Sequence, residues 1–153
     1  METVFISQNE EQTAKIAAQL SELTQAGDIW ALHGTLGMGK SVFARAFIQN
    51  LTDAEEVPSP TFTLVQMYAA PHFEIYHYDL YRLEKPSDTF ELGIEEAFYN
   101  GVCLVEWPEK MENLAPRNMW NVQLEPDENG RKITISTDDE NKIQRLQKWL
   151  NAK

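Results

Sequence analysis

The residues GTLGMGKS, at positions 34–41, form the stretch that decides the fold of this 153-residue chain. They match the pattern G-x-x-x-x-G-K-[ST], in which glycines let successive backbone N–H groups turn toward phosphate oxygens without side-chain clashes. The apolar run IWAL at 29–32 precedes the pattern, and apolar side chains recur at helical spacing over 42–51 after it. A strand, a glycine-rich loop and a helix in this order are the context in which the pattern binds a nucleotide.

The polar residues of the loop have distinct expected roles toward ATP and Mg²⁺. Lys40 supplies positive charge to the outer phosphates, and Ser41 offers a hydroxyl to the metal. The helix that follows adds the partial positive charge of its N-terminus. We therefore predict that ATP is bound by Gly34, Gly37, Met38, Gly39, Lys40, Ser41 and Val42.

Helical and strand patterns alternate along the rest of the chain. Residues 101–105 are a continuous apolar run, which is typical of a strand buried on both faces. The predicted helices cover 10–26, 42–51, 87–99 and 139–151, and the predicted strands cover 29–32, 62–68, 73–79, 101–105, 121–125 and 131–136. This order predicts an α/β fold in which residues 1–153 form a single three-layer P-loop NTPase-like domain with a central mixed sheet.

Two acids stand where predicted strands end. Glu106 follows the most apolar strand, and Asp79 ends the strand at 73–79. Mg²⁺ prefers oxygen ligands, so either carboxylate could bind the metal or orient the attacking water. How these roles divide between the two acids stays open at this point. The predicted metal ligands are Ser41, Asp79 and Glu106.

Thr61 is a candidate for a mobile switch segment. It lies 20 residues beyond Ser41, in a loop that Pro58 and Pro60 keep extended. Its hydroxyl could meet the γ-phosphate or the metal and release it after hydrolysis. A plain loop leading into a strand explains the same spacing equally well. With this threonine, the predicted catalytic residues are Lys40, Thr61, Asp79 and Glu106.

The histidines and tyrosines carry weaker signals. His33 and His77 are expected to pack or to support other residues, because no cluster at metal-site spacing surrounds them. Tyr76, Tyr78 and Tyr81 alternate along a predicted strand, which indicates either core or a partner surface.

Composition limits the partners and the compartment. Thirteen basic residues oppose 24 acidic residues, and the net charge of −11 disfavours direct, stable binding of RNA or DNA. The chain shows neither an export signal nor an apolar run long enough for a membrane span. The lone Cys103 lies in an apolar run, as a buried thiol would. We expect a cytoplasmic protein.

Two other classes of P-loop protein remain as alternatives. A small-molecule kinase needs several basic side chains on a lid to clamp the transferred phosphoryl group, whereas the arginines here are scattered. A GTP-dependent switch would carry a guanine-reading N-K-x-D segment, and residues 141–144 read NKIQ, without the aspartate. The kinase is the alternative that we retain.

Four blocks in this order resemble the TsaE (YjeE) family, and the resemblance covers nearly the whole chain. They are GTLGMGKS at 34–41, SPTFTLV at 59–65, HYDLYRL at 77–83 and VEWPE at 105–109. The resemblance implies an ATPase that assists the bacterial synthesis of N6-threonylcarbamoyladenosine, the modified base beside the tRNA anticodon. It also implies association with the TsaB and TsaD proteins, of which TsaD carries the transferase chemistry.

The same resemblance extends the expected site. It implies that Thr13 in the first helix and Arg131 in the last hairpin border the nucleotide, and that Trp107 lies beside the hydrolysis site. The family loop commonly reads GDLGAGKTT, so Thr35 and Met38 depart from it here. The hydroxyl expected to meet the metal is kept.

Overall fold

The apolar run predicted as a strand forms β2 (Ile29–His33), and neighbours on both sides place it inside a sheet. The computed structural model describes residues 2–35, 37–60 and 63–152. Over these residues seven strands form one mixed sheet in the order β1-β7-β6-β2-β5-β4-β3. The four strands β6, β2, β5 and β4 run parallel, and the outer strands pair antiparallel. The predicted α/β fold with a mixed sheet is confirmed.

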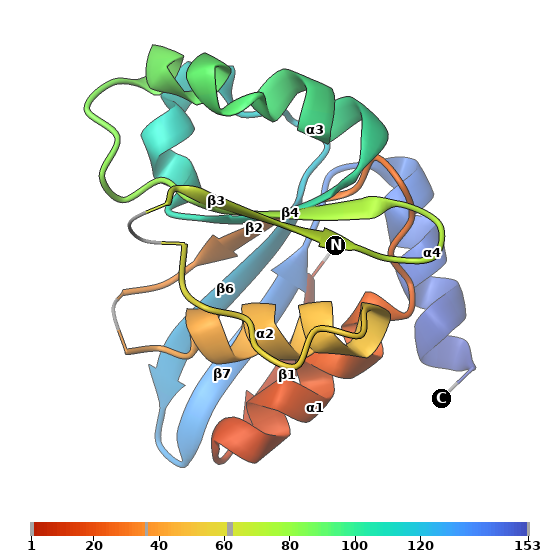
Figure 1. Ribbon diagram of the computed structural model, residues 1–153. Coiled ribbons are helices and arrows are strands. Elements are labelled where there is room, and N and C mark those ends of the chain that lie inside the picture. Colours follow the sequence, from red (N-terminus) through yellow and green to blue (C-terminus); the bar gives the residue numbers. More distant parts are fainter. Residues whose placement is uncertain (1, 36, 61–62, 153) are drawn as a thin grey trace.

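The elements alternate along the chain much as the sequence patterns indicate (Figure 1). Besides β2, the strands are β1 (Glu2–Ser7), β3 (Val65–Ala69), β4 (Glu74–Asp79), β5 (Val102–Glu106), β6 (Trp120–Asp127) and β7 (Gly130–Ser136). The α-helices are α1 (Glu10–Ser21), α2 (Lys40–Leu51), α3 (Ile94–Asn100) and α4 (Glu140–Asn151). The described residues also form two 3₁₀ helices, η1 (Pro86–Leu92) and η2 (Pro108–Leu114).

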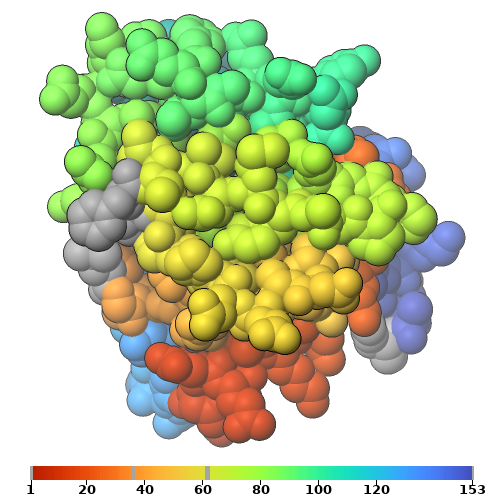
Figure 2. Space-filling view, in the orientation of Figure 1, coloured from red at the N-terminus to blue at the C-terminus, as the bar shows by residue number. Residues whose placement is uncertain are grey.

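Helices cover both faces of the sheet, so the central strands are apolar on both sides. Trp30 and Leu32 of β2 pack with α1, α2 and α4, whereas Ile29 and Ala31 pack with α3 and η2. Figure 1 shows α1 and α2 below the sheet and α3 above it. In Figure 2 β3 and β4, coloured yellow to yellow-green, lie between these two helical layers.

An aromatic stack fixes β6 beside β2. Trp30 and Trp120 are paired in the parallel register, and their rings stack with centroids 4.8 Å apart and planes 9° apart. Phe47 of α2 meets Trp30 edge-on at 5.2 Å. Such pairs add about 0.5–1.5 kcal/mol each beyond the burial of their apolar surface. The stack therefore joins two strands and a helix that are far apart in the sequence.

The first helix is shorter than predicted, because hydrogen bonds to the buried carboxylate of Asp28 hold the residues after the helix in a turn. The prediction was 10–26, but α1 ends at Ser21. The carboxylate of Asp28 accepts hydrogen bonds from the backbone N–H of Gln25 at 3.0 Å and from the hydroxyl of Thr24 at 3.1 Å. These bonds hold a turn where the apolar spacing indicates further helix.

The predicted helix at 87–99 is instead two elements. Gly93 has φ +67, which ends the 3₁₀ helix η1 and precedes α3. The predicted strand at 62–68 begins only at Val65, after Leu64 with φ +70. The sequence patterns also missed β1 and η2.

The longest helices are modest in length. α1, α2 and α4 contain 12 residues each, whereas a membrane-spanning helix needs about 20 apolar residues. Within the described ranges, no helix combines the length and the apolar character that crossing a membrane requires.

The salt bridge between Arg145 and Asp28 attaches α4 to the body of the protein, and its loss should destabilise the fold. Nη1 and Nη2 of Arg145 donate to the two carboxylate oxygens of Asp28 at 2.9 and 2.7 Å. Arg145→Ala would leave a carboxylate buried beside Lys142, whose Nζ lies 3.9 Å away. We expect a loss of about 3 kcal/mol in the free energy of unfolding, measured by urea denaturation. The exposed Arg45→Ala is the control, and equal losses would contradict the prediction.

Candidate phosphate-binding site

The glycine-rich loop connects the carboxyl end of β2 to the start of α2. The N-cap of α2 is Gly39, in the left-handed conformation, and no side chain caps the helix. The first N–H groups of a helix have no partner within the helix, so an uncapped start suits an anion. The first helical bond, from Phe43 N–H to Gly39 O, is 2.9 Å long. The local structure of the loop agrees with a phosphate-binding role.

Parallel strand order brings the candidate acids to this loop. β5 lies next to β2, and β4 lies next to β5, all three parallel. The carboxyl ends of parallel strands meet at one edge of a sheet, where α/β proteins place their ligands. Register pairs Glu106 with Leu32 on one side and with Asp79 on the other. Both predicted acids therefore lie at the edge from which the loop emerges.

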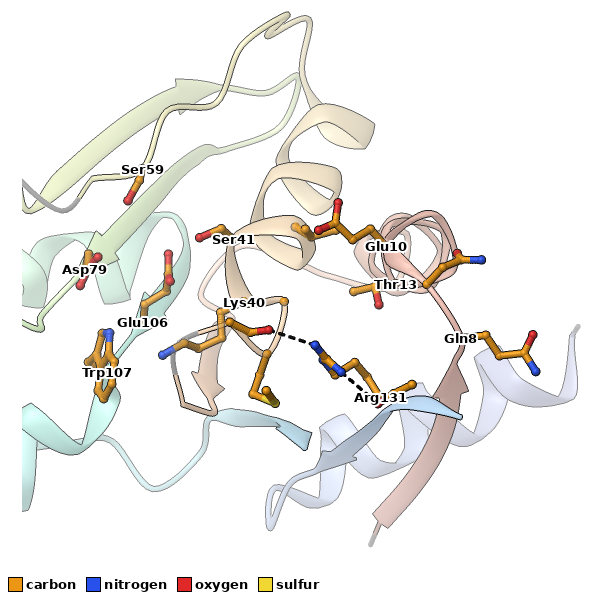
Figure 3. Close-up of a pocket in the computed structure, with 16 residues that line it drawn as sticks. Gln8, Glu10, Thr13, Lys40, Ser41, Ser59, Asp79, Glu106, Trp107 and Arg131 are labelled. Atoms are coloured by element: carbon orange, nitrogen blue, oxygen red, sulfur yellow. Dashed lines mark hydrogen bonds between the residues drawn. The ribbon is translucent and has the colours of Figure 1, made fainter. Parts of the chain in front are cut away.

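A pocket of about 400 Å³ lies over this edge (Figure 3). Lys40 and Ser41 occupy its middle, with Asp79 and Glu106 on one side of them. Figure 3 shows α1 and the β7 hairpin on the other side. The residues that line the pocket are Gln8, Asn9, Glu10, Thr13, Gly37, Met38, Gly39, Lys40, Ser41, Val42, Ser59, Asp79, Glu106, Trp107, Gly130 and Arg131.

Lys40 is buried in an acidic and aromatic environment. Its Nζ lies 3.7 Å from the centroid of the Trp107 ring and has no hydrogen-bond partner among the described residues. Burial lowers the pKa of Lys40 below its ordinary value, and the charges of Glu106, Glu109 and Asp79 oppose that shift. The attraction to the ring and to the acids keeps the ammonium group in the pocket. Its N–H donors remain available to a bound anion.

The two acids are nearly inaccessible to solvent and are already oriented by hydrogen bonds. Asp79 accepts a bond from the backbone N–H of Tyr81 at 3.0 Å, and Glu106 pairs with His77 at 2.6 Å. In the described part of the chain, no group of three or more His, Cys, Asp or Glu side chains could hold a metal alone. Mg²⁺ ordinarily takes one or two carboxylates together with phosphate oxygens and waters, so the acids and Ser41 fit that donor set.

The other end of the pocket is built by β1, α1 and β7. Nη2 of Arg131 donates to the carbonyl oxygen of Gly37 at 3.2 Å, which ties the hairpin to the loop. The hydroxyls of Thr13 and Ser7 lie 2.6 Å apart and are buried. Thr13 and Arg131, expected from the family resemblance, thus line the same pocket as Lys40.

Most of the predicted site residues come together in this pocket. Gly34 is not among the lining residues, and Thr61 lies outside the described residues. Residues that line the pocket without having been predicted are Gln8, Asn9, Glu10, Ser59 and Gly130. The sequence contains two signals for them: Asn9 is the N-cap of α1, and Ser59 belongs to the block at 59–65 that resembles the family.

Among the remaining predictions for tyrosines and histidines, the structure corrects the one for Tyr81. Tyr76 and Tyr78 stack with centroids 6.4 Å apart, and the hydroxyl of Tyr78 donates to the carbonyl of Leu92. Tyr81 does not continue this face, because β4 ends at Asp79; it is 50% exposed and contacts Trp107. Nε2 of His33 pairs with Oδ1 of Asn121 at 2.9 Å. Both histidines therefore contact single polar partners, as expected of supporting residues.

Fold and pocket together define an α/β protein with a glycine-rich loop and paired acids at the carboxyl edge of a mixed sheet. The chain belongs to the TsaE family: the family model described as "Threonylcarbamoyl adenosine biosynthesis protein TsaE" matches residues 7–133. Membership places the chain among proteins involved in the N6-threonylcarbamoyladenosine modification of tRNA.

Individual relatives agree with this assignment. The chain is 42% identical over 136 residues to a TsaE protein of Rickettsia felis, covering 88% of this chain and 80% of the relative. A Bacillus subtilis TsaE protein is 35% identical over 130 residues, covering 84% and 81%. The crystal structure of Bacillus subtilis YdiB superposes with a TM-score of 0.80 at 26% identity, covering 99% of this chain and 95% of that one.

Close packing against β6 should make Gly34 the most sensitive glycine of the loop. A Cβ at Gly34 would lie 2.8 Å from the backbone oxygen of Leu124, whereas a Cβ at Gly37 would meet no atom within 4 Å. Gly37→Ala should cost about 1 kcal/mol, because its φ of +84 disfavours a side chain. Gly34→Ala, at φ +146, adds a clash with backbone and should lower the melting temperature further. Equal melting temperatures would contradict this reading.

Proposed function

We propose that residues 1–153 form a single P-loop ATPase domain that hydrolyses ATP with Mg²⁺ in the cytoplasm. The hydrolysis supports N6-threonylcarbamoyladenosine modification of the tRNA adenosine next to the anticodon, together with the TsaB–TsaD complex. The observation that carries the proposal is the convergence of Lys40, Ser41, Asp79 and Glu106 in one pocket. Membership of the TsaE family supports the pathway.

The charges in the pocket indicate which of its ends would hold the phosphates. Lys40 and the start of α2 would hold the outer phosphates. The buried Nζ of Lys40 has no hydrogen-bond partner among the described residues, which fits this role. Ser41, Asp79 and Glu106 would hold Mg²⁺, which neutralises charge on the phosphate oxygens. The nucleoside would then lie toward Thr13 and Arg131 at the other end.

Hydrolysis needs a group that orients the attacking water. We assign that role to Glu106, with Asp79 as the second carboxylate toward the metal. Glu106 is 5% exposed and is among the charges that act on Lys40. A carboxylate in this position also accepts the water proton as the bond to phosphorus forms. Thr61 remains the proposed switch residue. Its hydroxyl would contact the γ-phosphate or the metal and release it after hydrolysis.

Protein partners fit the surface charge better than nucleic acid does. The net charge of −11 repels a phosphate backbone at physiological salt. We therefore propose that the chain does not bind tRNA stably by itself, and that it contacts TsaB and TsaD, as the family resemblance implies.

A small-molecule kinase is the less favoured reading. Such an enzyme clamps the transferred phosphoryl group with several basic side chains. Within the described ranges, Arg131 is the arginine that lines the pocket, and its guanidinium is bonded to carbonyl oxygens of Gly130 and Gly37.

Removing the charge of Lys40 should weaken ATP binding and abolish tRNA modification. We expect Lys40→Ala to weaken ATP binding by at least about tenfold, which corresponds to about 1.4 kcal/mol of binding free energy. Binding would be followed by calorimetry, and modification by a reaction reconstituted with purified TsaB, TsaD and tRNA. Lys15→Ala, at an exposed position of α1, is the matched control. Normal modification by the Lys40 variant would refute the proposal.

Glu106→Ala should separate binding from turnover. The variant keeps the loop and Lys40, so ATP affinity should stay within a few-fold of the original. Loss of a group that orients or deprotonates water should slow hydrolysis by about 10²–10⁴-fold, measured as phosphate release with Mg²⁺. If hydrolysis persists, the role belongs to Asp79, which Asp79→Ala would then reveal.

A further inference from the structure

A buried hydrogen bond joins His77 of β4 to Glu106 of β5. Nε2 of His77 lies 2.6 Å from Oε2 of Glu106, and the residues are 2% and 5% exposed. The parallel register places His77 beside Leu104, two residues before Glu106. Successive side chains of a strand point to opposite faces, so His77 and Glu106 share the face that carries Ile75 and Leu104.

Glu106 needs this bond because its side chain is largely buried, with 5% of the residue exposed. A buried carboxylate is stable only with hydrogen bonds or opposite charge. Lys40 supplies the charge, but its Nζ makes no hydrogen bond to any described residue. His77 supplies the N–H. One oxygen of Glu106 is therefore held by β4, and the other is left for the pocket that Glu106 lines.

The environment of the imidazole indicates which nitrogen carries its proton. Nδ1 of His77 is buried and has no partner in the described part of the chain. A proton on Nδ1 would be an orphaned donor, whereas a bare acceptor is tolerated more readily. We therefore assign the proton to Nε2, from the network of bonds around the ring. His77 then donates to Glu106 and leaves the carboxylate charge on the pocket side.

We propose that His77 is a positioning residue for the proposed ATPase reaction: it holds Oε2 of Glu106 so that the second carboxylate oxygen faces the metal and the attacking water. This inference rests on the proposed function and adds a residue that acts through Glu106, without touching ATP. Removing a group that orients a metal-site carboxylate typically costs about 10–100-fold in metal affinity or activity. With ATP and Mg²⁺ both saturating, the effect of losing His77 should fall on kcat.

The main test compares two substitutions of His77. His77→Leu removes the donor, and we expect kcat to fall by about 10–100-fold while the Kd for ATP, measured without Mg²⁺, changes by less than about threefold. His77→Gln places an amide N–H near the position of Nε2 and should restore most of kcat. A folded leucine variant with the original kcat would overturn the inference, as would a glutamine variant no faster than the leucine one.

A second comparison remains informative if the leucine variant does not fold. His77→Asn keeps a polar amide but is too short to reach Oε2, so it should lower kcat by about 10–100-fold from that of the unaltered protein. Adding His77→Asn to Glu106→Ala should then change the residual single-turnover rate little, because the group that His77 orients is absent. An equal fold-loss in both backgrounds would show that His77 acts independently of Glu106, contrary to the inference.

The chain provides a matched control and a way to separate the two hypotheses. His33 pairs with Asn121 at 2.9 Å in a different hollow of the surface, so His33→Leu should leave kcat unchanged. If the unaltered protein neither binds nor hydrolyses ATP, the proposed function fails. If it hydrolyses ATP as fast as the His77 variants do, only the positioning role fails.

Discussion

The parallel alignment of β2, β5 and β4 is the constraint on which the site depends. It places the glycine-rich loop, Glu106 and Asp79 at the same edge, although they come from distant parts of the chain. Side chains alternate along a strand, so a one-residue slip between β4 and β5 would turn Asp79 and His77 to the opposite face. The register is maintained by two apolar layers, one on each face of β5.

The apolar strands also set the electrostatics of the pocket. At the carboxyl ends of these strands lie three buried charged residues, Lys40, Asp79 and Glu106, which are 5%, 6% and 5% exposed. Burial makes each charge costly, which is why the acids accept hydrogen bonds and the lysine lies over an aromatic ring. Two acids face one lysine here, so the divalent cation of the proposed function would supply the positive charge that a polyphosphate beside these acids needs.

Local patterns predicted the centre of the molecule better than its periphery. β2, β4 and β5 were identified because buried parallel strands are short, continuous apolar runs or clear alternations. The predicted helix at 87–99 breaks at Gly93, and α1 ends early because Asp28 bonds to the turn that follows it. Such endings depend on individual hydrogen bonds and on one residue with positive φ, which apolar spacing does not report.

The sequence by itself determined the phosphate-binding pattern, its setting between strand and helix, the acids at strand ends and the family. The first three are local properties, since each depends on residues within a few positions of one another, and the family follows from the order of several such short blocks along the chain. Only the tertiary structure decided that His77 bonds Glu106, that Lys40 lies on Trp107 and that β7 brings Arg131 to the loop. Those contacts follow from strand order and register, which are set by long-range packing that short-range periodicity does not encode.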